Sequence, residues 1–179
     1  MKPRFLSLAG IVFAAALWRL VPHPWNVTPV AAMALFAGAH FSSRRAAYAV
    51  PLAAIFLSDL VLGFYPTMPW VYAAFALIVF IGTFLRSRRD TGSVALGAIS
   101  GSVLFFLVTN FGHWVSTSMY PKSPAGLAAC FTAAIPFFRN TLLGDVAFTA
   151  AFFGGFAVLE RRFPALRESP AVERQPGYR

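Results

Sequence analysis

Charged residues make up only 12% of this chain of 179 residues. A soluble domain usually carries about 25%, so the composition excludes an ordinary soluble protein. Hydrophobic residues reach 58% of the sequence, which predicts a membrane protein with several spans. The formal net charge is +9, but the basic residues form short clusters between apolar runs rather than one continuous face. We therefore expect the lipid bilayer, and no nucleic acid, among its partners.

Residues for metal binding and covalent catalysis are also few. Cys130 is the single cysteine, which excludes an intrachain disulfide and a cysteine-rich metal site. The three histidines, His23, His40 and His113, are scattered along the sequence. No Gly-rich phosphate loop and no nucleophile beside a base can be recognised. We predict that the protein is not an enzyme and holds no metal or other cofactor, and that any ATP-driven step belongs to another subunit.

Six apolar segments stand out, and each is a candidate membrane helix. They cover residues 5–21, 27–41, 46–64, 70–85, 93–115 and 140–159. Residues 126–138 are apolar as well but too few to span, so we expect an interfacial or re-entrant segment that ends at Pro136. The predicted fold is an all-α bundle of six transmembrane helices, one domain over residues 1–162. The polar residues 163–179 are expected to form a disordered cytoplasmic tail.

The distribution of basic residues predicts the topology. Six spans place both termini on one side, and with that side in the cytoplasm the positive-inside rule is satisfied. Twelve of the fifteen lysines and arginines then lie inside: Lys2, Arg4, Arg44, Arg45, Arg86, Arg88, Arg89, Arg161, Arg162, Arg167, Arg174 and Arg179. Lys122 lies outside, and Arg19 and Arg139 lie at outer helix ends. We expect a multi-pass protein of the bacterial inner membrane.

Polar side chains inside the apolar segments gather near the outer ends of the predicted helices. Ionisable groups in hydrocarbon cost roughly 2.5–3.5 kcal/mol each, so they usually mark a site. We predict that they form a pocket, open to the outer face, that binds a small solute. The candidate residues are Arg19, Asn26, Asp59, Asn110, His113, Trp114, Arg139, Asn140 and Asp145. Trp25 and Trp114 would offer stacking faces to a planar compound.

The same charges also have a purely structural interpretation. Arg19 or Arg139 could pair with Asp59 or Asp145 and so lock helices together. The separation of six positions between Arg139 and Asp145 places these two on divergent faces of one helix. We therefore favour a pair between Arg139 and Asp59.

Small residues form two helix faces that favour close packing. The segment 31–39 is rich in alanine, with Ala34 and Gly38 four positions apart, and Gly97 and Gly101 repeat that spacing. Such faces let helices approach closely in lipid. Tight packing inside the bundle is one interpretation, and docking to a membrane partner subunit is the other.

Five strings in the sequence are distinctive. They are 19–26 (RLVPHPWN) with 29–36 following, Ser58-Asp59 before Gly63-Phe64, 108–112 (VTNFG) before Trp114, Tyr120-Pro121, and 135–145 (IPFFRNTLLGD). Together they resemble an uncharacterised bacterial family of suggested transport proteins, a domain of unknown function, over roughly residues 6–160. A weaker resemblance, of architecture alone, is to the S components of energy-coupling-factor (ECF) vitamin transporters. It implies an Ala-rich docking helix, an outer substrate pocket, and partners in the form of a transmembrane coupling subunit and an ATPase module.

The sequence thus leads to two hypotheses of function. The first is a membrane transport protein that binds a vitamin-like or planar solute near the outer face and releases it inside. The alternative is a non-transporting structural or assembly subunit of a larger membrane complex, in which the charges lock helices and the small faces bind neighbours.

Overall fold

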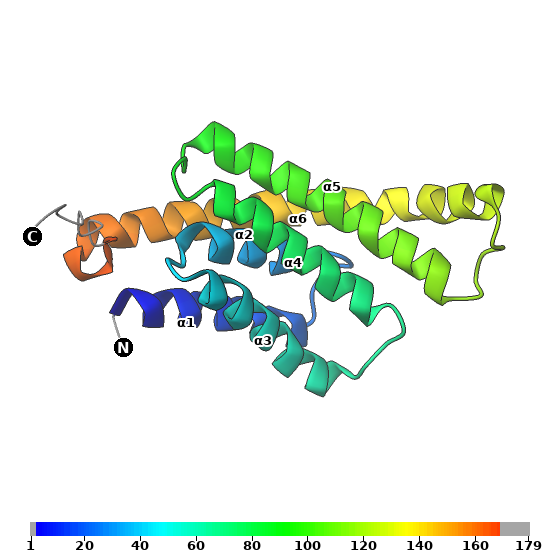
Figure 1. Ribbon diagram of the computed structural model, residues 1–179, viewed down its shortest axis with the longest axis horizontal. Coiled ribbons are helices and arrows are strands. Elements are labelled where there is room, and N and C mark those ends of the chain that lie inside the picture. Colours follow the sequence, from blue (N-terminus) through cyan, green and yellow to red (C-terminus); the bar gives the residue numbers. More distant parts are fainter. Residues whose placement is uncertain (1–2, 169–179) are drawn as a thin grey trace, which may run out of the picture.

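The structure, a computed structural model, describes residues 3–168, and all regular structure in this range is helical. Six α-helices form an elongated bundle (Figure 1). They are α1 (Pro3–Leu17), α2 (Val30–His40), α3 (Arg44–Leu62), α4 (Met68–Phe84), α5 (Thr91–Ser116) and α6 (Pro124–Arg162). Two 3-10 turns, η1 (Trp18–Leu20) and η2 (Pro164–Leu166), follow α1 and α6. The predicted all-α class is confirmed.

Local sequence explains where three of the helices begin. Ser43, Asp90 and Ser123 precede α3, α5 and α6, and each side chain accepts a hydrogen bond from the backbone N–H three residues later, at 3.4, 3.0 and 3.1 Å. These bonds satisfy donors that the first turn of a helix leaves without partners. Pro124 occupies the first position of α6, where its missing N–H costs nothing.

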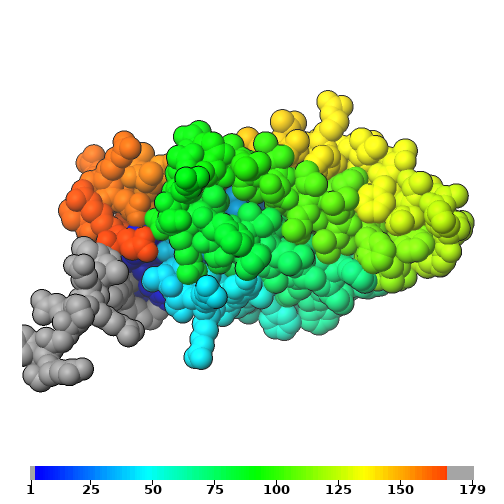
Figure 2. All heavy atoms as spheres, turned by 45° about the horizontal axis from the view of Figure 1, so that its top comes forward, coloured from blue at the N-terminus to red at the C-terminus, as the bar shows by residue number. Residues whose placement is uncertain are grey.

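The loops alternate between two ends of the bundle. The α2–α3 and α4–α5 loops lie at the same end as the start of α1 and the end of α6 (Figure 1). We call this the basic end, because it carries Arg44, Arg45, Arg86, Arg88, Arg89, Arg161 and Arg162. The α3–α4 and α5–α6 loops lie at the opposite end, where the α5–α6 hairpin extends furthest (Figures 1 and 2).

Helix α2 forms the centre of the bundle. All of its residues, Val30–His40, are buried. It packs against α4 at very short distance, because a Cβ added to Gly38 would lie 2.2 Å from the carbonyl oxygen of Val79, and one added to Gly82 would lie 2.3 Å from that of Leu35. The small-residue face of α2 therefore serves internal packing, and the alternative, in which this face docks on a partner subunit, is wrong.

The last helix differs from its prediction. Residues 126–138 do not form a separate re-entrant segment, because α6 runs without interruption from Pro124 to Arg162 with Pro136 inside it. Phe106 of α5 contacts α6 on both sides of this proline, with ring centroids 5.5 Å from Phe131 and 4.8 Å from Phe138. Phe106 thus packs against α6 before and after the position at which the proline removes a backbone hydrogen bond.

Within the residues that the structure describes, four helical segments are long and apolar enough to cross a membrane: Pro3–Leu20, Arg44–Leu62, Thr91–Ser116 and Pro124–Arg162. The 39 residues of α6 extend about 58 Å at 1.5 Å per residue, well beyond a hydrocarbon core of about 30 Å. Helices α2 and α4 are apolar but shorter, at 11 and 17 residues. Membrane residence is compatible with these lengths.

The first residues of the predicted disordered tail are ordered. Residues 163–168 turn back through η2 onto the bundle, where Leu166 is buried. Arg4 of α1 donates to Glu160 and to the carbonyl oxygen of Leu166, which ties the two ends of the chain together. The rest of that prediction, residues 169–179, lies outside the described residues.

Candidate functional site

Asp59 of α3 is completely buried and fully partnered. Its Oδ1 lies 2.6 Å from Nη2 of Arg19, and the Tyr72 hydroxyl donates to its Oδ2 at 2.8 Å. Arg19 also donates to the hydroxyl of Ser58 at 2.5 Å. The predicted pair of Arg139 with Asp59 is therefore wrong, because Arg19, in the turn that follows α1, is the arginine that binds the carboxylate. This network joins η1, α3 and α4 and leaves Asp59 no free oxygen for a solute.

Asp145 occupies a different part of the interior. It is 2% exposed on α6, and the Ser102 hydroxyl of α5 donates to its Oδ2 at 2.7 Å. Within residues 3–168, no basic side chain forms a salt bridge with it. One turn further along α6, the buried hydroxyl of Thr149 has no partner in the same range. Both residues border a narrow void that has no room for a water molecule, so this void is no solute site.

The three predicted asparagines gather around one cavity of about 320 Å³. Asn26 and Asn110 line it, and Asn140 donates to the carbonyl oxygen of Trp25 at 3.1 Å, which fixes the loop that carries Asn26. We call it the amide cavity; its walls are Trp25, Asn26, Phe105, Phe106, Thr109, Asn110, Ala134, Phe137, Phe138 and Thr141. It lies between the α1–α2 connection and the halves of α5 and α6 away from the basic end.

The loop that closes the amide cavity has a specific backbone requirement. Asn26 has φ 60°, the left-handed region that asparagine tolerates better than most residues. The next residue packs directly on α6, since a Cβ added to Gly144 would lie 3.3 Å from the Cα of Val27. Two features of the sequence therefore favour the position of Asn26 at the cavity. Asparagine tolerates this backbone conformation, and Gly144 leaves room for the loop against α6.

The chemistry of the amide cavity is that of a neutral site. No charged side chain lines it, five aromatic residues form most of its walls, and two amides with two hydroxyls supply its polar groups. Asn110 uses one amide N–H to donate to the carbonyl oxygen of Phe106 at 2.8 Å. Its carbonyl oxygen and second N–H are the groups that can meet a ligand.

The remaining predicted site residues lie elsewhere. Trp114 donates to the carbonyl oxygen of Pro121 at 2.9 Å, and the ring of His113 lies 6.3 Å from that of Tyr120, so both belong to the tip of the α5–α6 hairpin. Arg139 is exposed on α6 and has no salt bridge within residues 3–168. The nine candidates thus separate into a buried ion pair, an isolated carboxylate, an amide group, two half-buried residues at the hairpin tip and the exposed Arg139.

The sequence matches one known protein family over nearly its whole length. Residues 1–166 match the model described as "Family of unknown function (DUF6580)". The chain belongs to this family. No curated protein and no solved structure matches it.

Sequence reasoning missed two further cavities of this DUF6580 member. One, of about 560 Å³, lies between α5 and α6 toward the basic end, and the other, of about 550 Å³, lies between α1 and α6. It also missed Tyr72 and Ser102, the hydroxyl donors to Asp59 and Asp145. A hydroxyl inside an apolar run is a usable signal for such a donor, whereas no sequence pattern indicates a gap between helices.

Proposed function

We propose that this protein binds a small, neutral, planar solute in the amide cavity and serves the transport of that solute across the bacterial inner membrane. The observation that carries the proposal is the convergence of Asn26 and Asn110 on one cavity with an aromatic wall. A cavity of mainly apolar lining with a few convergent polar groups is the usual form of a small-molecule site.

The lining of the cavity defines the class of solute. Because no charged side chain is present, a charged solute would lose its hydration without compensation. Aromatic walls favour a flat ring, and amides supply both a donor and an acceptor. A volume of about 320 Å³ lies at the lower end of ligand pockets, which run from roughly 300 to 1,000 Å³. A heteroaromatic compound of one or two rings, as in many vitamins, fits these requirements.

The proposed orientation places the basic end in the cytoplasm. Arginine clusters at both loops of that end and near the end of α6 support this orientation under the positive-inside rule. The amide cavity then lies in the outer half of the membrane, where a solute arrives. The chain has no phosphate-binding loop, so energy would come from a transmembrane coupling subunit with an ATPase module. Docking of that subunit would use lipid-facing helix surfaces, since α2 is buried.

A structural or assembly subunit is the second candidate. The observation that favours it is the Arg19–Asp59–Tyr72 network, in which every polar group of Asp59 is already bonded within the bundle. Such a network stabilises helix packing and has no need of a solute. Under this alternative the protein would act only as part of a larger membrane complex.

Native mass spectrometry of protein purified in mild detergent separates the two candidates. The transport proposal predicts a co-purified neutral compound of low mass, released on denaturation and identified in the supernatant. Co-purification of an ATP-binding cassette module would in addition support the proposed coupling to an ATPase. Protein free of any small molecule, recovered together with a respiratory or photosynthetic assembly, would contradict it and favour the second candidate.

A further inference from the structure

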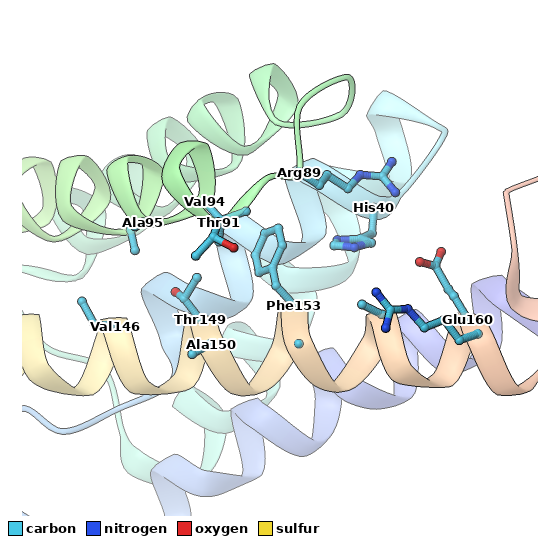
Figure 3. Close-up of a pocket in the computed structure, with 14 residues that line it drawn as sticks. His40, Arg89, Thr91, Val94, Ala95, Val146, Thr149, Ala150, Phe153 and Glu160 are labelled. Atoms are coloured by element: carbon cyan, nitrogen blue, oxygen red, sulfur yellow. The ribbon is translucent and has the colours of Figure 1, made fainter.

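One cavity opens between α5 and α6, toward the basic end. Its volume is about 560 Å³. Figure 3 shows Thr91, Val94 and Ala95 of α5 facing Val146, Thr149 and Ala150 of α6 across it, with His40, Arg89 and Glu160 gathered at one end. The cavity is thus apolar along most of its length and polar at the end that faces the arginine clusters. We call it the α5–α6 cavity.

The polar end of the α5–α6 cavity carries excess positive charge. Arg89 and Arg161 line it together with Glu160. Glu160 is already paired with Arg4, and Arg89 is paired with Glu168 at 2.9 Å. Arg161 forms no salt bridge within residues 3–168, and the buried Nε of Arg89 has no hydrogen-bond partner there. A guanidinium N–H without a partner and a second, uncompensated guanidinium favour an anionic group at this end.

The apolar part of the α5–α6 cavity is open at the side of the bundle. Ala95, Val146 and Ala150 on its walls are exposed, and a Cβ added to Gly154 meets no atom within 4 Å. In a membrane, such a lateral opening faces acyl chains rather than water. A ligand that enters here must therefore be apolar along its length and anionic at one end.

We propose that the α5–α6 cavity binds an anionic phospholipid from the leaflet at the basic end. One acyl chain lies between α5 and α6, and the phosphate lies against Arg89 and Arg161. Basic pockets between transmembrane helices on the cytoplasmic side are suited to acidic headgroups. A free phosphate ion would use only the polar end and leave the long apolar part empty, so the lipid is the occupant that matches the whole cavity. This site is separate from the amide cavity and does not depend on the solute proposed there.

The test is native mass spectrometry of detergent-purified protein titrated with phosphatidylglycerol or phosphatidylcholine of the same acyl chains. We expect one phosphatidylglycerol retained per protein and at least fivefold weaker retention of phosphatidylcholine. Arg161→Gln should lower phosphatidylglycerol affinity about fivefold, which corresponds to about 1 kcal/mol for one basic residue near the membrane surface. Addition of inorganic phosphate should not displace the lipid.

Two adjacent glycines provide a matched pair of variants. Gly154 lines the α5–α6 cavity and Gly155 lines the cavity between α1 and α6, and an added Cβ meets no atom within 4 Å at either position. Gly154→Leu should strongly reduce lipid retention, because its side chain would occupy part of the space needed by the acyl chain, whereas Gly155→Leu should retain the lipid as the wild type does. Equal retention by both leucine variants, equal retention of the two lipids, or displacement by inorganic phosphate would each overturn the proposal.

Discussion

The guanidinium of Arg19 lies 2.6 Å from the buried carboxylate of Asp59, a residue forty positions away. Arg19 lies in η1, directly after α1, and Asp59 lies in the last turns of α3, so the pair fixes how these two segments meet. The Tyr72 hydroxyl completes the network from α4. One carboxylate therefore links η1, α3 and α4.

Removal of one partner of this ion pair should cost more than removal of both. Arg19→Met leaves the Asp59 charge buried and unpaired, which typically costs about 3–5 kcal/mol. Asp59→Leu combined with Arg19→Met should recover most of that loss, because no unpaired charge remains. Thermal unfolding followed by fluorescence in detergent measures both. A double variant as unstable as Arg19→Met alone would show that the pair does more than neutralise a buried charge.

Close packing of α2 on α4 predicts a strong position dependence for glycine substitutions. Gly38→Ala should destabilise the protein by about 1–3 kcal/mol, because its Cβ would lie 2.2 Å from the carbonyl oxygen of Val79. Gly10→Ala is the matched control in α1, where an added Cβ meets no atom within 4 Å. The control should unfold at the same temperature as the wild type or slightly higher. Similar losses for both variants would contradict the close contact of α2 and α4.

The start of α5 predicts one part of the pH dependence of stability. The Ser93 hydroxyl and backbone N–H donate to the Asp90 carboxylate and lower its pKa below the ordinary value. A depressed pKa stabilises the folded state above the unfolded pKa of about 3.9, and this contribution is lost as the pH falls through the lower folded pKa. Asp90→Asn keeps a capping side chain but cannot titrate. It should therefore reduce the loss of stability between about pH 5 and about pH 3. An unchanged pH profile in this variant would contradict the assignment.

Cysteine labelling tests the proposed orientation. In a Cys130→Ala background, Ser118→Cys lies at the opposite end and Arg88→Cys at the basic end, and both positions are exposed. A membrane-impermeant maleimide should label Ser118→Cys in intact cells and Arg88→Cys only after lysis. The reverse pattern would place the amide cavity on the cytoplasmic side.

Sequence reasoning located five of the six described α-helices closely, but it did not predict how the helices pack against one another. Apolar runs and arginine clusters are local properties, so they indicate helices and the alternation of loops between two ends. Pro136 suggested a break, whereas α6 continues through it and Phe106 packs against the helix on both sides, a tertiary contact that no local pattern reveals. The same limit explains the central, fully buried position of α2.

For the candidate site, the sequence predicted how far along each helix a polar residue lies, but not which way its side chain points. Distance along a helix gave the depth of each polar residue, and depth alone suggested a single cluster. The direction in which a side chain points around its helix depends on its neighbours, and it separates Asp59, Asp145 and Asn110 into three different environments. Only the asparagines gather at a cavity. Arg139 was paired with Asp59 because its spacing from Asp145 excluded a contact within one helix, but it is Arg19 that lies against α3, where it also donates to the carbonyl oxygen of Ile55 at 3.4 Å.

Ligand retention by Asn110 variants tests the central claim most directly. Asn110→Leu removes an amide from the wall of the amide cavity, whereas Thr132→Val removes a hydroxyl of α6 that lines no described cavity and bonds only to the carbonyl oxygen of Ala128. Native mass spectra of the wild type and both variants, purified side by side, would compare the occupancy of a small neutral compound. The account predicts occupancy in the wild type and in Thr132→Val and at least a tenfold loss in Asn110→Leu, or about 1.4 kcal/mol. Equal occupancy in all three proteins would contradict it.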